Sequence, residues 1–158
     1  MNYLLVATLL LGWTLLALSI VDLLAFRLPD VLTLPLTGLG LLLSLSLPDS
    51  HPLAHLIGAA SGFFALYSVA LLYRSVRRRE GLGLGDAKLA AAAGAWLGWQ
   101  ALPFAVLIAC AAGFILVGVA AILRGRKAFQ EEIAFGVPLC LAIWLVWLYG
   151  VPDFVLGG

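Results

Sequence analysis

Residues 87–123 read "AKLAAAAGAWLGWQALPFAVLIACAAGFILVGVAAIL", and Lys88 is the only charged side chain in the stretch. As one straight helix, at ~1.5 Å per residue, it would extend about 55 Å. The hydrocarbon core of a bilayer is only about 30 Å thick. The segment "LGWQALP" (97–103) contains a glycine, a glutamine and a proline, which together are typical of a turn. We therefore expect two membrane-crossing helices joined within this segment.

The remainder of the chain has the same apolar character. Of its 158 residues, 64% are hydrophobic and 11% are charged, whereas a soluble domain carries about 25% charged residues. Four further apolar runs are each close to the ~20 residues that a membrane helix needs: 3–21, 31–47, 53–73 and 133–150. The sequence thus predicts an all-α integral membrane protein in the lipid bilayer, with one domain over residues 1–158 and about six transmembrane helices. The fourth, about 87–99, is expected to be unusually short.

The basic residues predict the orientation of these helices. All nine lie in three connections: Arg27 in the first; Arg74, Arg77, Arg78, Arg79 and Lys88 in the third; and Arg124, Arg126 and Lys127 in the fifth. Six alternating spans place these connections on one side of the membrane, which the positive-inside rule makes cytoplasmic. Both termini are then expected on the non-cytoplasmic side. A net charge of +1 leaves no basic surface that would hold a nucleic acid.

Two carboxylates stand out because they share a predicted membrane face and depth. Asp22 interrupts the apolar run "LALSIVDLLAF" (16–26), and Asp86 opens the expected short helix. An ionisable residue at membrane depth is costly and indicates a functional site. Local explanations exist, because Asp86 can cap its helix and Asp22 can pair with Arg27. Two adjacent carboxylates, however, can share one proton, so that one activates water while the other polarises a carbonyl, as in aspartic proteases.

The stretch "REGLGLGDAKL" (79–89) places three alternating glycines before Asp86: Gly81, Gly83 and Gly85. Residues without a Cβ allow an extended substrate backbone to come close, and they allow a loop to change shape and bring one aspartate to the other. The spacing fits neither the GxGxxG pattern of dinucleotide sites nor a Walker loop, which needs Gly-Lys followed by Ser or Thr. A loop that admits a peptide is the interpretation that remains.

The sequence indicates neither a metal site nor a cofactor site. Cys110 and Cys140 lie in apolar runs without the CxxC spacing of metal or redox sites, and we interpret both as small buried residues. His51 and His55 are four residues apart and could share a helix face. No third ligand stands near them in the sequence, so we interpret them as structural.

Three blocks of the sequence resemble the type IV prepilin peptidases, which are membrane aspartic proteases with a GxGD motif. The blocks are "VDLLAFRLPDVLTLPLTGLGLLLSL" (21–45), "EGLGLGDAKLAAAAGAWLGWQALP" (80–103) and "IAFGVPLCLAIWL" (133–145). The resemblance implies that Asp22 and Asp86 are the catalytic pair. It also implies family counterparts for further positions: Gly83 and Gly85 in GxGD, Lys88 in GDxKL, Pro29 and Asp30 in the turn after the first aspartate, and Gly136 and Pro138 in the last block.

The resemblance also implies a reaction and a substrate. Members of this family remove a short basic leader from type IV prepilin or pseudopilin precursors, in type IV pilus assembly and type II secretion. Cleavage occurs at the cytoplasmic face of the bacterial inner membrane, just ahead of the precursor's apolar segment. By this resemblance the protein is a hydrolase that uses two aspartates and water, without a cofactor.

Other acidic residues lie in the predicted cytoplasmic connections: Asp30, Glu80, Glu131 and Glu132. Solvated carboxylates there need no special role. An alternative is that Glu80, Glu131 and Glu132 attract the basic leader through ion pairing, which salt would weaken.

The sequence departs from the family pattern in two places. Many members carry an N-terminal cytoplasmic region with paired CxxC motifs that is linked to methylation of the new N-terminus, and this sequence has no such cysteines. We therefore expect proteolysis without methyl transfer. The last block reads "AFGVP" where the family usually has PFGP, a change that we expect to be tolerated.

Two alternative functions stay open at this point. A GxGD peptidase could act on other membrane substrates, such as signal-peptide remnants. A non-enzymatic assembly factor or small transporter could use the two aspartates to bind protons or cations. The glycine loop favours peptide hydrolysis, since a proton relay needs only carboxylates in helices, whereas a peptidase needs room for an extended backbone.

Overall fold

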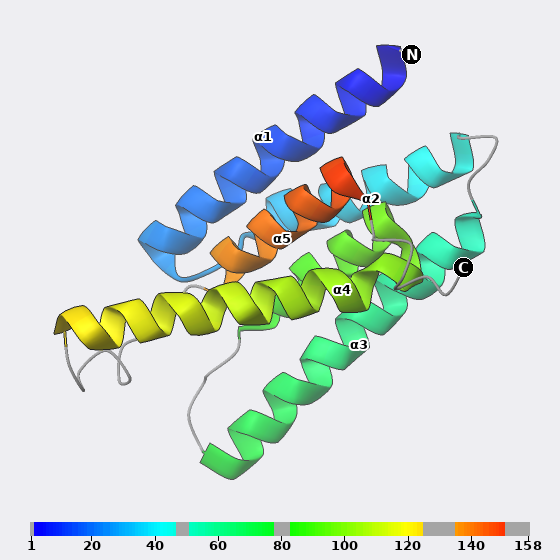
Figure 1. Ribbon diagram of the computed structural model, residues 1–158. Helices are drawn as coiled ribbons and strands as arrows, with labels where there is room; N and C mark the ends of the chain where they lie inside the picture. The colour runs from blue at the N-terminus through cyan, green and yellow to red at the C-terminus, as the bar shows by residue number, and fades with distance from the viewer. Residues whose placement is uncertain (1, 47–50, 78–82, 125–134, 151–158) are drawn as a thin grey trace.

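The computed structural model describes residues 2–46, 51–77, 83–124 and 135–150, which form helices and contain no strand (Figure 1). The helices are α1 (Asn2–Ala25), α2 (Asp30–Ser46), α3 (Pro52–Arg77), α4 (Leu84–Arg124) and α5 (Gly136–Tyr149). By length and composition, α1, α3 and α4 can each cross a membrane, while α2 and α5 are shorter apolar helices. The prediction of an all-helical membrane protein is confirmed. The six-span count and the orientation stay predictions.

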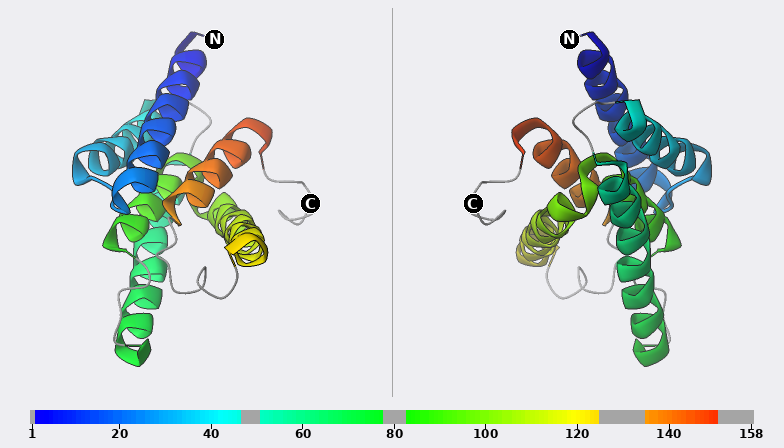
Figure 2. Two further views of the ribbon diagram at one scale, coloured as in Figure 1. Left: turned by 90° about the vertical axis from the view of Figure 1, so that its left-hand side faces the viewer. Right: turned by 90° about the vertical axis from the view of Figure 1, so that its right-hand side faces the viewer.

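Helix α4 is broken at Gly98, inside the predicted turn. Gly98 has φ 78° and ψ 169°, a left-handed conformation that only glycine adopts without strain. The chain folds back there, so that the two parts of α4 diverge from the break (Figures 1 and 2). Nδ1 of His55 lies 3.0 Å from the Ala95 carbonyl oxygen beside the break. Because a carbonyl oxygen only accepts, this nitrogen carries the proton, which supports the structural interpretation of His55.

Helices α3 and α4 pack closely because small residues face one another. A Cβ on Gly58 would lie 2.6 Å from the carbonyl oxygen of Gly94, and one on Gly62 would lie 2.5 Å from that of Ala90. Small residues four apart let helix backbones approach in this way, which is the usual basis of helix association in membranes. This contact fixes the first part of α4 against α3.

Helix α1 buries a single narrow stripe. Ala7, Leu11, Leu15 and Leu18 are all at most 7% exposed, and Asp22 continues the same stripe at 4%. The three- and four-residue steps place these side chains on one helix face. Leucine and tryptophan side chains cover the opposite face, as expected where a helix meets lipid. The position of Asp22 in the stripe points its carboxylate into the protein.

Two helices have ends that differ from the sequence prediction. Helix α1 continues to Ala25 instead of ending at residue 21, and α4 begins at Leu84 instead of near residue 87. Both aspartates therefore lie within helices. The chain leaves α1 through Phe26, whose φ of 50° is in the left-handed region. This turn lets α2 start at Asp30, close to the end of α1.

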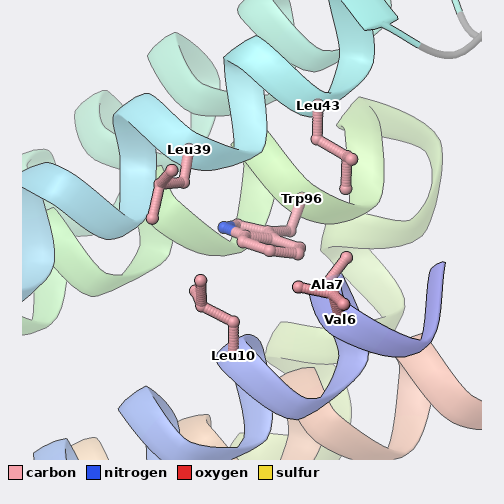
Figure 3. A pocket seen from close by; sticks show the side chains of 6 residues that line it. All are labelled: Val6, Ala7, Leu10, Leu39, Leu43 and Trp96. Atoms are coloured by element: carbon pink, nitrogen blue, oxygen red, sulfur yellow. The ribbon is translucent and has the colours of Figure 1, made fainter. Parts of the chain in front are cut away.

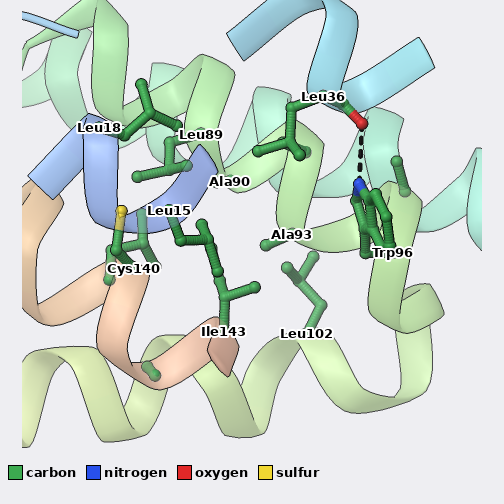
Figure 4. Packing of buried hydrophobic residues seen from close by; sticks show 14 of the residues in the cluster. Leu15, Leu18, Leu36, Leu89, Ala90, Ala93, Trp96, Leu102, Cys140 and Ile143 are labelled. Atoms are coloured by element: carbon green, nitrogen blue, oxygen red, sulfur yellow. Dashed lines mark hydrogen bonds between the residues drawn. The ribbon is translucent and has the colours of Figure 1, made fainter. Parts of the chain in front are cut away.

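Two tryptophans connect four of the helices in the apolar core. The Trp96 Nε1–H donates a hydrogen bond to the Leu36 carbonyl at 2.8 Å (Figure 4), and its ring packs edge-on against Trp147 at 5.4 Å. Trp147 in turn donates to Thr8 Oγ1 at 3.1 Å. An apolar pocket of about 160 Å³ lies beside Trp96 (Figure 3), lined by Val6, Ala7, Leu10, Leu39, Leu43 and Trp96. The pocket adjoins the first half of α1, whereas Asp22 lies in its last turn.

Candidate active site

Asp22 is held at the junction of α1 and α5. The backbone amides of Gly136 and Val137, at the start of α5, interact with its carboxylate, as expected for an anion at a helix N-terminus. Its Oδ2 atom is buried and has no hydrogen-bond partner among the described residues. A buried polar atom without a partner is rare in proteins. The exposed side chain of Arg27 forms no ion pair with Asp22, so the pairing that the sequence allowed is wrong.

Asp86 is the third residue of α4 and is 8% exposed. Its Oδ2 atom accepts a hydrogen bond from the Gly83 amide at 3.2 Å, and its own amide donates to the Gly83 carbonyl at 3.1 Å. A carboxylate at this position that reaches back to the amide before the helix forms half of a capping box. Asp86 therefore does stabilise the helix start, though from inside the helix. Its second carboxylate oxygen takes no part in this capping hydrogen bond.

Contacts among Gly136, Leu28 and Gly85 bring the two aspartates to one end of the bundle. A Cβ on Gly136 would lie 2.5 Å from Asp22 Oδ2 and 3.2 Å from Leu28 Cδ1, and a Cβ on Gly85 would lie 2.8 Å from Leu28 Cβ. Leu28 therefore sits between the residue before Asp86 and the residue that faces Asp22. The charges of the two carboxylates interact, although no hydrogen bond joins them within the part of the chain that the structure describes. Figure 1 shows the end of α1 and the starts of α2, α4 and α5 on the same side.

The glycines of the loop differ in what surrounds them. A Cβ on Gly85 would overlap Leu28, whereas one on Gly83 would be 3.7 Å from Asp86 Oδ2, an ordinary contact distance. Of these two glycines, Gly85 alone is required by close packing, while Gly83 is exposed and an added Cβ there would have ordinary contacts with the described residues. Gly81, the remaining glycine of the loop, lies outside the described residues. The proposed leader contacts Glu80, Glu131 and Glu132 also lie outside them.

Lys88 and Asp30 form an ion pair that the sequence did not predict. The Lys88 ammonium donates to both carboxylate oxygens of Asp30, each at 2.6 Å, and the two side chains are 31% and 55% exposed. Asp30 was expected to be a solvated loop carboxylate. It is instead the first residue of α2, and its partner lies two residues after Asp86. Asp30 is therefore largely solvated, as expected, but it is paired with Lys88 and lies in a helix instead of a loop.

Cys140 lies near the site, although its sequence context predicted only a small buried residue. This buried side chain, 2% exposed, lies beside Ser19 and near both aspartates. The position of Cys140 could have been predicted from its distance along the chain to a site residue. Cys140 is one helical turn after Gly136 and Ser19 is about one turn before Asp22, so each shares a helix face with a site residue.

The described residues contain no group of three His, Cys, Asp or Glu side chains that could hold a metal ion. The chemistry that they offer is that of the two carboxylates. A buried pair in an apolar setting can take a proton from one group and give a proton to another, which is general acid–base catalysis.

The sequence of the chain is similar to one protein family and to several known proteins. The sequence model of the type IV leader peptidase family matches residues 9–118. The prepilin leader peptidase/N-methyltransferase of Burkholderia pseudomallei is 44% identical over 144 residues, which are 91% of this chain and 46% of that protein. Proteins with the same name are similarly close in Aeromonas salmonicida (44% over 145 residues, 91% and 49%) and Pseudomonas aeruginosa (43% over 149 residues, 91% and 49%). The chain spans about half the length of the curated relatives it matches. No solved structure matches it.

Proposed function

Because the chain belongs to the type IV leader peptidase family, we propose that it is an aspartic endopeptidase of the bacterial inner membrane. Its proposed substrate is a membrane-inserted prepilin or pseudopilin precursor, from which it removes the short basic leader. The observation that carries the proposal is the burial of Asp22 and Asp86 at one end of the bundle, close enough for their charges to interact. Their positions in the chain lie within the segment that the family matches.

The proposed reaction uses water as the nucleophile. The ionised carboxylate takes a proton from water as the oxygen adds to the scissile carbonyl carbon, and the protonated carboxyl gives its proton to the carbonyl oxygen. Collapse of the tetrahedral intermediate then breaks the carbon–nitrogen bond. The leaving amine takes up the proton that came from water, and a hydroxyl of the intermediate gives a proton back to the second carboxylate as the product carboxylic acid forms, which returns the pair to its starting state.

Gly83, three residues before Asp86, supports the passage of a peptide beside the site. It is exposed, and among the described residues an added Cβ would meet only Asp86 and the Gly85 amide within 4 Å. We propose that an extended precursor backbone passes here, with its scissile bond toward the aspartates. Glu80, Glu131 and Glu132 are proposed to attract the basic leader, an effect that added salt should reduce.

The proposed topology places this end of the molecule at the cytoplasmic face. The basic connections include Arg27 and Lys88, which lie near the two aspartates in the chain. With α4 counted as two parts, there are six helices that alternate in direction, and both termini are proposed to lie on the other side. Helix α5 has 14 residues, or roughly 21 Å, so a thinner bilayer or a sunken helix end must accommodate it.

Incubation of the purified protein with a prepilin precursor in lipid tests the proposal. We expect a single cut ahead of the apolar segment, identified by mass spectrometry of both products. An intact precursor after incubation with folded protein would contradict the proposal and would favour a role in proton or cation binding. The absence of methyl transfer stays a prediction. Added S-adenosylmethionine should leave the mass of the mature product unchanged, and a gain of one methyl group would contradict it.

A further inference from the structure

Two contacts link the turn between α1 and α2 to the start of α4. Leu28 is buried, and its backbone nitrogen and Cβ lie against Gly85, the residue before Asp86. Asp30 binds the ammonium of Lys88, two residues after Asp86, through both carboxylate oxygens at 2.6 Å. The turn therefore contacts α4 on either side of the aspartate. Since Leu28 also adjoins Gly136, the same turn reaches the residue that faces Asp22.

We propose that the Asp30–Lys88 ion pair, together with Leu28, is a clamp that sets the position of Asp86 relative to Asp22. In this role Asp30 and Lys88 are positioning residues, because neither is hydrogen-bonded to either catalytic carboxylate within the described chain. The effect of the clamp on catalysis rests on the proposed function. The effect of the clamp on the position of Asp86 relative to Asp22 does not depend on that function.

The placement of the two charges supports a positioning role over a role in helix stability. Asp30 begins α2, where the helix dipole favours a negative charge, but Lys88 lies in the second turn of α4, where the dipole gives a positive charge no stabilisation. A half-exposed ion pair also contributes little to folding. Lys88 and Asp86 are two residues apart on a helix and so point in different directions. Lys88 is therefore directed to Asp30 and away from the catalytic carboxylate.

The clamp makes a different prediction from two simpler roles. If Asp30 only kept the Lys88 charge away from the aspartates, removing both charges together would restore activity. If Asp30 bound the basic leader of the substrate, its loss would raise KM and leave kcat unchanged. A clamp requires that kcat fall when either partner is neutralised, that the double neutral variant be no better, and that a pair of reversed charges recover activity.

Precursor cleavage by the full chain in lipid nanodiscs separates these roles. For Asp30→Asn and for Lys88→Met we expect kcat about tenfold lower with KM little changed, because small displacements of catalytic groups have effects of this size or larger. The double variant Asp30→Asn, Lys88→Met should match the single variants, since both remove one shared interaction. The exchanged pair, Asp30→Lys with Lys88→Asp, and the conservative Asp30→Glu should regain most of kcat. Wild-type kcat in the double neutral variant, or a change in KM alone, would overturn the clamp.

A distance measurement tests the clamp without an activity assay. Spin labels at positions 24 and 84 would lie two residues from each aspartate, at side chains that are 80% and 54% exposed. In a background with Cys110→Ala and Cys140→Ala, we expect one narrow distance distribution for the native pair, a broader or shifted one for Asp30→Asn, and a narrow one again for the exchanged pair. Equal distributions in all three would overturn the clamp. If the distances respond as expected but the wild-type protein cleaves no precursor, the proposed function fails and the clamp stands.

Discussion

Two regions of this molecule use glycine to bring helices together, and the glycines face different kinds of neighbour. Between α3 and α4, Gly58 faces Gly94 and Gly62 faces Ala90, so that backbone lies against backbone. At the aspartate end, Gly85 faces Leu28, and Gly136 faces the Asp22 carboxylate. The first contact is apolar and holds two helices together. The second positions the Asp22 carboxylate and the turn that contains Leu28. We therefore expect an added methyl group to lower Tm in the first region and kcat in the second.

The largest effect is expected from Asp22→Asn and from Asp86→Asn. Each substitution keeps the shape of the side chain but removes an ionisable carboxyl, and loss of a general acid or base lowers rates by about 10²–10⁴. We expect precursor cleavage to fall to background while the elution profile and Tm of the purified protein stay close to wild type. Asp22→Asn with a near wild-type rate would show that the two-aspartate mechanism is wrong.

The next largest effect is expected from Gly58→Ala and Gly94→Ala. The new methyl group would meet backbone that cannot move aside, and overpacking of this kind costs about 1–3 kcal/mol. Tm and yield of folded protein should both fall, and activity should fall only in proportion to the folded fraction. Gly38→Ala and Gly118→Ala are matched controls, because no atom of the described residues lies within 4 Å of a Cβ at either position. If Gly94→Ala lowered kcat of the folded fraction with Tm unchanged, the two regions would not differ as described.

Gly85→Ala tests the other side of the comparison. Its methyl group would press on Leu28 and displace the segment that precedes Asp86, so we expect kcat to fall by about tenfold or more with a small change in Tm. Gly113→Ala is the matched control, since its Cβ would have only ordinary contacts, with the Phe135 ring. Wild-type kcat in Gly85→Ala would mean that packing against Leu28 does not set the position of Asp86.

The sequence predicted the features that depend on length and order along the chain. The apolar run over 87–123 was too long for one crossing, and the break lies at Gly98 within the predicted turn. Alternation of spans placed Asp22 and Asp86 at one end, where the structure has both buried and near each other.

The features that the sequence did not predict depend on how each helix is rotated about its axis. In a soluble protein the apolar stripe shows the buried face, but a membrane helix is apolar all round. On α1, buried Leu11 and Leu15 look no different in the sequence from exposed Leu9 and Leu16. The contacts of Gly136 with Asp22 and of Lys88 with Asp30 follow from that rotation, and only the three-dimensional arrangement reveals them.

The smallest effect is expected at His55, which lies on the α3–α4 side of the comparison. The His55 ring donates a hydrogen bond to the Ala95 carbonyl beside the break at Gly98. His55→Ala removes that donor, and a typical hydrogen bond of this kind contributes about 1 kcal/mol. Tm should fall by a few degrees while kcat is unchanged, because the contact is in the fold-supporting region. His51→Ala, at an exposed position, is the control.

The comparison of Tm with kcat separates a role of His55 in the fold from a role in catalysis. A loss of Tm at unchanged kcat is the result expected for a hydrogen bond that joins α3 to α4. A fall in kcat without a fall in Tm would place His55 with the aspartates and would remove the distinction between the two regions.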